Sequence, residues 1–231
     1  MRILIMVALF PPLFYSCFCP ASGIQVGRTR IIFDANKKEV ALALTNTDTQ
    51  LPWLIQSWTD TGDEKTRGPF IVTPPLFRLN AQKEQSLRIT WNGTLLPENK
   101  ESLFYMNVRT IPATAKENES KNILRLIYKT RLKLLWRPKN ITGSPAQSCE
   151  KLQFVRSGNQ LQVTNNNAFY TVFDSLHLGA VSLPKADMVA PFSTATFPLP
   201  VQANGDQVTW HCITDYGNAS QQYSAPLSKG G

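Results

Sequence analysis

The sequence predicts an all-β protein made of two immunoglobulin-like β-sandwich domains, and three observations lead to this prediction. Apolar and polar residues alternate over many short segments, which is the period of a half-buried strand. The 231 residues include 16 prolines and 12 glycines, and interior prolines, at roughly 3 kcal/mol each, argue against long helices. A polar stretch with two prolines divides the chain into two parts, each near the size of one sandwich.

The alternation is clearest in four segments along the chain. Residues 40–44 and 87–91 place apolar side chains at every second position and end at turn-like sequences. Residues 152–163 carry two alternating runs separated by Ser-Gly-Asn, which predicts a β-hairpin. Residues 208–212 alternate in the same way, so we expect Cys212 to point into a core.

The domain boundary is expected in the polar stretch. We predict a first domain over residues 23–138, a linker over residues 139–145 and a second domain over residues 146–231. The two domains then hold about 115 and about 85 residues, and an immunoglobulin-type sandwich needs roughly 100.

Residues 1–22 have the order of a secretory signal peptide. Arg2 precedes an apolar run over residues 3–18, and small residues follow at positions 21–23. The apolar run is shorter than the roughly 20 residues of a membrane-spanning helix, so a membrane anchor is the less favoured alternative. We therefore expect cleavage, export and no stable membrane insertion.

Export changes the interpretation of the cysteines. Cys17 and Cys19 leave with the signal peptide, so the exported chain keeps Cys149 and Cys212. An isolated pair in an oxidising compartment favours a disulfide over a metal site or a nucleophile. Closing the loop between them would stabilise the fold by roughly 4 kcal/mol. The alternative is two free buried thiols.

The chain is basic, since 24 Lys and Arg against 16 Asp and Glu give a formal net charge of +8. Such a charge suits an acidic partner, but exported proteins rarely meet nucleic acid. The local basic cluster alternates with apolar residues, as in a strand, unlike a nucleic-acid-binding tail. Its members are Lys129, Arg131, Lys133 and Arg137. We expect no nucleic-acid partner.

The residues give little support for catalysis. The two histidines, His177 and His211, have no sequence neighbour that suggests a catalytic triad or a metal site. The sequence also has no glycine-rich phosphate loop. We therefore expect no catalytic residue, no metal site, no cofactor and no enzymatic activity.

The most informative segment is residues 122–137, which is far longer than an ordinary strand. Apolar side chains occupy both of its faces, which predicts cover on both. One face carries Leu124, Leu126, Tyr128 and Leu132, and the other carries Ile123 and Ile127. Two interpretations stay open: a central strand buried in its own sandwich, or an edge strand that a partner must cover.

Five spaced motifs make the chain similar to one family. The longest is LPENKESLFYMNVRTIP at residues 96–112. The shorter ones are TRIIF at residues 29–33, GPF to TPP at residues 68–75, KLLWRP at residues 133–138 and DYG at residues 215–217. In their order and spacing they resemble the motifs of the periplasmic pilus-assembly chaperones of the chaperone–usher pathway, and they span nearly the whole exported chain.

The resemblance implies two sandwiches in a boomerang arrangement with a cleft between them. Arg30 and Lys133 correspond to the pair of cleft cations that hold the C-terminal carboxylate of a pilus subunit. A donor strand lends alternate apolar side chains to the groove of an incomplete subunit, which is the family's known mechanism. Its residues here are Leu124, Leu126, Tyr128 and Leu132. Tyr128 departs slightly from the family, in which a smaller aliphatic residue is common at that place.

One position departs from simple periodicity. Lys133 has the opposite parity to Leu124 and Leu126, so a flat, uninterrupted strand would point it away from them. A bulge or a strong twist between Thr130 and Lys133 would bring these side chains to one side.

The resemblance also implies a charge network and a subgroup. Glu101, Arg137 and Asp215 correspond to the family's interdomain network, which would fix the hinge angle. The short connection after the longest motif, and a first domain without cysteine, are similar to the short-loop subgroup that serves rod-like fimbriae. Cys149 and Cys212 would then lie in the second domain, where some members carry a disulfide.

The predicted function is that of a periplasmic chaperone. It would bind, fold and cap fimbrial subunits by donor-strand complementation and deliver them to an outer-membrane usher. The sequence leaves open whether the free protein caps its own strand by dimerising. The alternatives are a pilus structural subunit, which would be shorter and single-domain, and an exported immunoglobulin-like adhesin, which would bind glycans without using Arg30 and Lys133.

Overall fold

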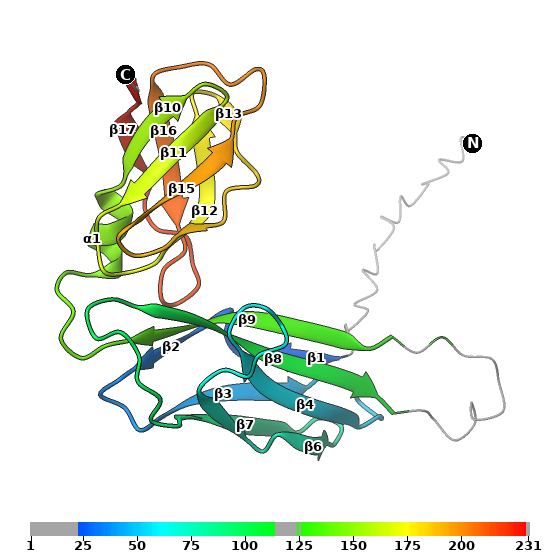
Figure 1. Cartoon of the computed structure of the whole chain (residues 1–231). Coiled ribbons are helices and arrows are strands. Elements are labelled where there is room, and N and C mark those ends of the chain that lie inside the picture. The colour runs from blue at the N-terminus through cyan, green and yellow to red at the C-terminus, as the bar shows by residue number, and fades with distance from the viewer. Residues whose placement is uncertain (1–22, 114–123, 125, 230–231) are drawn as a thin grey trace, which may run out of the picture.

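The structure is a computed structural model that describes residues 23–113, 124 and 126–229. The expected signal peptide, residues 1–22, lies outside the described residues, as does most of the connection that follows the longest motif. Nearly all of the described secondary structure is β, in two separate bodies (Figure 1). The predicted all-β fold with two sandwiches is therefore confirmed.

The first body is a sandwich of two sheets. One sheet has the strand order β1-β3-β7-β5 and the other has the order β2-β9-β8-β4-β6. The strands are β1 (Ile24–Val26), β2 (Arg30–Asp34), β3 (Glu39–Asn46), β4 (Trp53–Asp60), β5 (Phe70–Thr73), β6 (Leu76–Leu79), β7 (Glu84–Trp91), β8 (Ser102–Pro112) and β9 (Tyr128–Arg137).

Alternation along the strands builds the core of this sandwich. Val40, Leu42 and Leu44 of β3 face inward, and they lie opposite Ile89, Leu87 and Gln85 of β7 in the antiparallel register. Every second side chain of a strand points to the same face, so the apolar set of each strand meets that of the other sheet. Fully buried side chains include Ile31, Phe33, Leu42, Leu44, Ile55, Leu87, Ile89, Met106 and Leu134.

The second body is a smaller sandwich. Its sheets have the orders β15-β11-β10-β18 and β13-β12-β16-β17, and β14 also pairs with β12. The elements are α1 (Pro145–Glu150), β10 (Gln153–Ser157), β11 (Gln160–Asn165), β12 (Thr171–Leu178), β13 (Val181–Ser182), β14 (Met188–Val189), β15 (Ser193–Pro198), β16 (Gln207–Cys212), β17 (Tyr223–Pro226) and β18 (Ser228–Lys229).

The predicted hairpin and the inward face of residues 208–212 are both present. Ser157 of β10 pairs with Gln160 of β11, so two residues form the turn, and Gly158 has a φ of 58° there. Trp210 is 1% exposed, and its indole N–H donates to the Cys149 carbonyl over 2.9 Å. The second core forms around this tryptophan.

Cys149 and Cys212 form a disulfide, as predicted, and are not two free thiols. The bond joins α1 to the end of β16, with Cα atoms 6.2 Å apart and a sequence separation of 63. Cys212 is 5% exposed, so the bond lies inside the second sandwich.

The helix α1 was not predicted, and it begins at the last residue of the expected linker. Ser144 caps it, since the Ser144 hydroxyl accepts from the Gln147 N–H over 3.2 Å. Pro145 at the first helical turn needs no hydrogen-bond partner for its nitrogen. The Ser144-Pro145 pair therefore begins a helix here, where the sequence analysis expected a linker without regular structure. No helix in the described ranges has the length and hydropathy to span a membrane.

The two sandwiches meet at an angle, with α1 and the lower ends of β12 and β16 above the sheet that carries β2 and β9 (Figure 1). This arrangement is the expected boomerang. Several hydrogen bonds cross the junction, including that from the Glu101 N–H to the Ala168 carbonyl over 2.8 Å. The residues of greatest interest lie on this junction and on β9.

Replacing both Cys149 and Cys212 by alanine should lower the free energy of unfolding of the second sandwich by about 4 kcal/mol. The unfolded chain regains the entropy of a long open loop when the bond is absent. Urea unfolding followed by circular dichroism measures the change, and the reduced natural protein is the matched comparison. A loss below about 1 kcal/mol in both samples would contradict this entropic account.

Candidate functional site

The strand β9 is paired on both edges over only half of its length. It pairs with β8 from Tyr128 to Trp136. On its other edge the parallel strand β2 begins at Arg30, opposite Lys133. Within the described residues, no strand covers that second edge between Tyr128 and Leu132. The main-chain groups of this half are therefore available to another strand.

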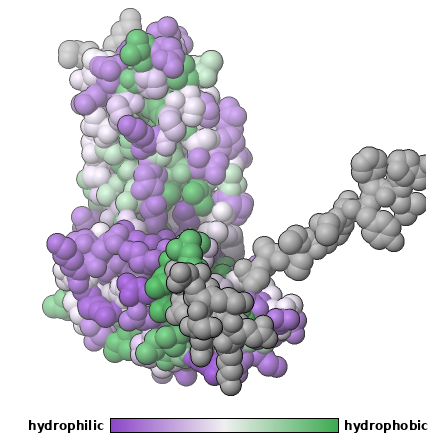
Figure 2. Space-filling model, turned by 90° about the vertical axis from the view of Figure 1, so that its right-hand side faces the viewer, coloured by the Kyte–Doolittle hydropathy of each residue, from purple (hydrophilic) through white to green (hydrophobic). Residues whose placement is uncertain are grey.

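Apolar side chains gather where the uncovered edge begins. Leu124 is 87% exposed, Leu126 52%, Ile127 57% and Tyr128 55%. A view onto this end of the first sandwich shows a hydrophobic patch beside the residues drawn in grey (Figure 2). Isolated exposed leucines are ordinary, but a contiguous group next to unpaired main chain marks an interaction surface. The interpretation as a strand buried in its own sandwich is wrong for residues 124 and 126–128, and it holds for the end of the segment from Lys133 onward, where β9 lies between β2 and β8.

Leu132 does not belong to this exposed group, contrary to the expected donor set. It is 6% exposed and packs in the core of the first sandwich with Leu134 and Trp136. Leu132 points to the face of the strand that its parity predicts. At this position, however, that face is packed in the core of the first sandwich. The exposed portion therefore ends at Tyr128 among the predicted residues.

Of the two features considered between Thr130 and Lys133, a bulge or a strong twist, the bulge is absent. The residues of β9 pair one by one with those of β8 from Tyr128 to Trp136, without a register shift. Lys133 therefore projects from the opposite face of β9 to Leu132 and Leu134, away from the core. That outer face is turned toward the second domain, where Lys133 finds its partner.

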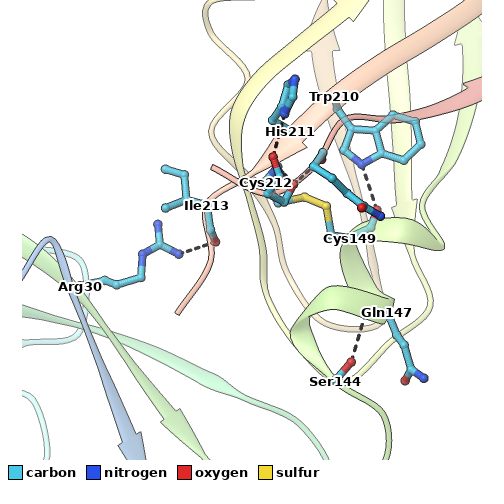
Figure 3. The surroundings of a disulfide bond; sticks show 10 residues. Arg30, Ser144, Gln147, Cys149, Trp210, His211, Cys212 and Ile213 are labelled. Carbon is cyan, nitrogen blue, oxygen red and sulfur yellow. Dashed lines mark hydrogen bonds between the residues drawn. A yellow bond between two sulfur atoms is a disulfide. The ribbon is translucent and has the colours of Figure 1, made fainter. Parts of the chain in front are cut away.

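Arg30 and Lys133 lie side by side at the junction of the two domains. They are register partners on the parallel strands β2 and β9. The Arg30 Nη1 donates to the Ile213 carbonyl over 3.0 Å, immediately after the disulfide-bonded Cys212 (Figure 3). The Lys133 ammonium donates to Asp187 Oδ1 over 2.8 Å. Both cations thus reach across to the second domain.

Burial distinguishes the two cations. Arg30 is 7% exposed, and burial lowers the pKa of its guanidinium, while Asp215, Asp187 and Glu101 act in the opposite direction. The Lys133 side chain is 22% exposed, and its partner Asp187 is 62% exposed. Arg30 is held in place, whereas Lys133 is within reach of solvent and of a ligand.

A second set of charges ties the domains together around Arg137. Its Nε donates to Glu101 Oε1 over 2.7 Å. Its Nη1 and Nη2 donate to the two oxygens of Asp215 over 2.7 and 2.9 Å, a bidentate pair. Burial lowers the pKa of Arg137, but the hydrogen bonds to Asp215 and the charge of Glu101 outweigh it and raise the pKa. The three residues predicted to form a network are in contact.

Glu101 is the buried centre of this network. Its side chain is 1% exposed, and burial raises the pKa of its carboxyl, against the influence of Arg137. Its second oxygen accepts from the Tyr170 N–H of the second domain over 2.8 Å. Oε1 is satisfied within the first sandwich by Arg137, whereas Oε2 depends on an N–H that the second sandwich supplies only at one relative position. Such a network specifies geometry more than it adds net stability.

A cavity of about 310 Å³ lies beside these residues at the domain junction. Arg30, Arg137, Tyr170, Ile213 and Asp215 contribute to its wall. In the part of the chain that the structure describes, no group of His, Cys, Asp and Glu is arranged to hold a metal ion. The wall combines the cations Arg30 and Arg137 with the carboxylates of Glu101 and Asp215 and with apolar side chains, and the cations are the groups that could contact a chain end bearing a carboxylate.

The sequence reasoning missed two residues of the junction. Gly217 has a φ of 91°, and a Cβ atom there would lie 2.1 Å from Thr29 Oγ1 of the first domain, so only glycine fits. The glycine of the DYG motif was the available signal. Asp187 had no signal, because nothing in its surrounding sequence marks it as facing Lys133.

Two family models match the chain, one for each sandwich. The model described as "Pili and flagellar-assembly chaperone, PapD N-terminal domain" matches residues 23–142. The model "Pili assembly chaperone PapD, C-terminal domain" matches residues 147–224. The chain belongs to the PapD family of pilus-assembly chaperones. Proteins of this family are periplasmic chaperones and not enzymes.

Curated relatives cover most of the chain. The chaperone protein FimC of Escherichia coli O6:H1 is 41% identical over 197 residues, which are 85% of this chain and 81% of FimC. The chaperone protein FocC of Escherichia coli is 38% identical over 226 residues, 96% of this chain and 97% of FocC. The chaperone protein LpfB of Salmonella typhimurium is 36% identical over 201 residues, 86% of this chain and 87% of LpfB.

Solved structures agree with the fold as a whole. A chain in the complex of the Salmonella enterica SafA pilin with the SafB chaperone superposes with a TM-score of 0.83 at 29% identity, covering 90% of this chain and 98% of that one. The E. coli chaperone DraB gives a TM-score of 0.80 at 33% identity, covering 89% and 98%. Both sandwiches and their relative placement are therefore those of the family.

Leu132 and Leu126 should respond differently to truncation, although they share parity. Leu132→Ala should lower the free energy of unfolding by about 2–4 kcal/mol, because it opens a cavity in the core. Leu126→Ala should change it by less than about 0.5 kcal/mol, because its side chain is half exposed. Chemical denaturation of the two variants tests this contrast, and equal losses would refute the assignment of Leu132 to the core.

Arg137→Ala should widen the distribution of interdomain angles while both sandwiches stay folded. The substitution removes the Nε and both Nη bonds and leaves Glu101 buried without its cation. Small-angle X-ray scattering measures the change as a broader distance distribution. Arg88→Ala is the matched control, because Arg88 pairs with Glu39 on the exposed surface of one sandwich. Identical scattering from both variants would count against the network as the determinant of the angle.

Proposed function

We propose that this protein is a periplasmic chaperone that binds fimbrial subunits, holds them folded and delivers them to an outer-membrane usher. An N-terminal signal peptide over residues 1–22 would direct its export. The observation that carries the proposal is the half-covered β9, with exposed apolar side chains at its start and two cations where the open edge ends.

The open edge supplies what an incomplete sandwich lacks. A subunit without its last strand exposes a hydrophobic groove and unpaired main chain. This chain offers a partner for each. Within the part of the chain that the structure describes, main-chain groups lie free along one edge of β9 from Tyr128 to Leu132, and the side chains of Leu124, Leu126 and Tyr128 lie outside the chaperone's core. Strand addition then gives affinity through the main chain and register through the side-chain pockets.

The two cations supply the anchor for the end of the guest chain. Arg30 and Lys133 are in register on adjacent strands, so a carboxylate placed between them would contact both. Charge-assisted hydrogen bonds of this kind are short and strong in a partly desolvated cleft. The SafA–SafB complex pairs a pilin with a chaperone, and a chain of that complex has the same architecture as this protein, which supports a pilin-like partner.

The charge network has a role in the same proposal. Glu101, Arg137 and Asp215 would hold the two sandwiches at the angle that a guest needs, since the hydrogen bonds of Arg137 to Asp215 and of the Tyr170 N–H to Glu101 span the junction. The alternatives of a pilus subunit or an adhesin are not favoured, because chaperone family models match both sandwiches.

Lys133→Ala and Arg30→Ala should each abolish a stable complex with a fimbrial subunit while the chaperone stays folded. When a tagged candidate subunit is captured from the periplasm, the chaperone variant should no longer be purified with it. The subunit itself should be degraded. Because Arg30 is 7% exposed, circular dichroism of each variant must show the natural melting profile before the result is used.

Lys83→Ala and Arg88→Ala are the matched controls, since they remove the same charges at and beside β7, in the opposite sheet. They should leave the captured complex intact. Normal accumulation of the subunit with both cleft variants would overturn the anchor assignment.

A further inference from the structure

Three carboxylates lie close to the cleft cations of the free protein. The charges of Asp215, Asp187 and Glu101 all act to raise the pKa of Arg30, against the larger effect of its burial. Only Asp187 among the three makes an ion pair with Lys133, over 2.8 Å. The proposed anchor for a carboxylate is therefore already in contact with one.

Two of the three carboxylates are committed to other partners. Glu101 accepts from Arg137 and from the Tyr170 N–H, and its side chain is 1% exposed. Asp215 accepts from both terminal nitrogens of Arg137. Neither could turn toward or away from a ligand without breaking the junction between the domains.

Asp187, in contrast, has an exposed carboxylate. Its side chain is 62% exposed, and Lys133 is the only partner that the described residues give it. Its main chain is fixed, because its carbonyl accepts from the Phe173 N–H over 2.8 Å and the next residue begins β14, which pairs with β12. The carboxylate is thus presented at a defined place beside Lys133, but it can turn into water without leaving a buried group unpaired.

We propose that Asp187 occupies, in the free chaperone, the place on Lys133 that the C-terminal carboxylate of a subunit takes in the complex. Loading is then an exchange of one carboxylate for another on the same ammonium. This inference rests on the proposed function and adds to it a residue that sets the strength of the anchor.

The exchange has a consequence for affinity. A guest that ends in a carboxylate replaces the ion pair that it breaks, and the displaced Asp187 is hydrated. A guest without a carboxylate, such as an internal loop, would leave the Asp187–Lys133 pair in place and gain nothing from Lys133. Competition with Asp187 therefore weakens only the hold on a guest that ends in a carboxylate, which suits a guest that must later be released.

Binding of a designed peptide to the mature chaperone tests the exchange. The probe is an N-acetylated peptide of about ten residues, a common strand length, with alternating valine and threonine and two N-terminal lysines for solubility. It is made once with a free C-terminal carboxylate and once as the amide. Asp187→Asn should lower the dissociation constant of the carboxylate form about two- to fivefold, the range of an exposed ion pair, and leave the amide form unchanged.

Three variants serve as controls. Asp187→Glu keeps a carboxylate and should bind the acid peptide as the natural protein does. Asp206→Asn makes the same change of net charge just before β16, at the end of that strand opposite to Cys212, and should have no effect. Lys133→Ala should bind the acid and the amide with nearly equal affinity.

The outcomes separate this inference from the proposed function. If Asp187→Asn binds the acid peptide no more tightly than the natural protein, while Lys133→Ala still loses the preference for the acid, the anchor stands and the exchange is refuted. If the natural protein shows no preference for the acid over the amide, both fail together. If Asp187→Asn weakens binding and broadens the scattering profile, Asp187 is a strut between the domains and the exchange is likewise refuted.

Discussion

The bidentate contact of Arg137 with Asp215, completed by Glu101, is the interaction on which the rest of the molecule depends. Each sandwich could fold around its own core, but the cleft exists only while the two are held at one angle. The network achieves this around a carboxylate that is almost fully buried, because any other angle would take the Tyr170 N–H from Glu101 and both hydrogen bonds to Asp215 from Arg137. Arg30 and Lys133 can face the second domain because Arg137, on the same sheet, has already fixed where that domain lies.

The uncovered half of β9 exposes the protein to unwanted pairing with other chains, and the fold limits this risk to a short stretch. An open, apolar strand edge invites pairing with any other chain. In this protein the open stretch is short, since β2 closes the edge from Lys133 onward. Charged side chains also line the outer face of the open half, where Lys129 and Arg131 pair with Glu64 and Asp60. Charge close to an edge is a common protection against uncontrolled pairing.

Much of the fold was predictable from the sequence, because strand alternation and the proline content are local signals that packing did not override. The site was predictable mainly through the resemblance of motifs such as residues 96–112 to a known family. Leu132 shows the limit of parity, which identifies a face but cannot tell whether that face is inside a sandwich or beyond its end. Asp187 shows a second limit, since it reaches Lys133 through the relative placement of two domains, and no local pattern encodes that placement. The Ser144-Pro145 pair was an available signal whose helix-starting meaning was overlooked.

The register of β2 against β9 has one further consequence. Because β2 starts at Arg30, opposite Lys133, a guest lying on the open half of β9 must stop where β2 starts. If the guest's carboxyl end is the part that meets the two cations, its chain runs in the same direction as β2, and the two together continue as one interrupted parallel strand beside β9. The start of β2 would then fix the position of the guest's last residue. Counting back from that residue gives the guest side chain that lies opposite each residue of the open half of β9.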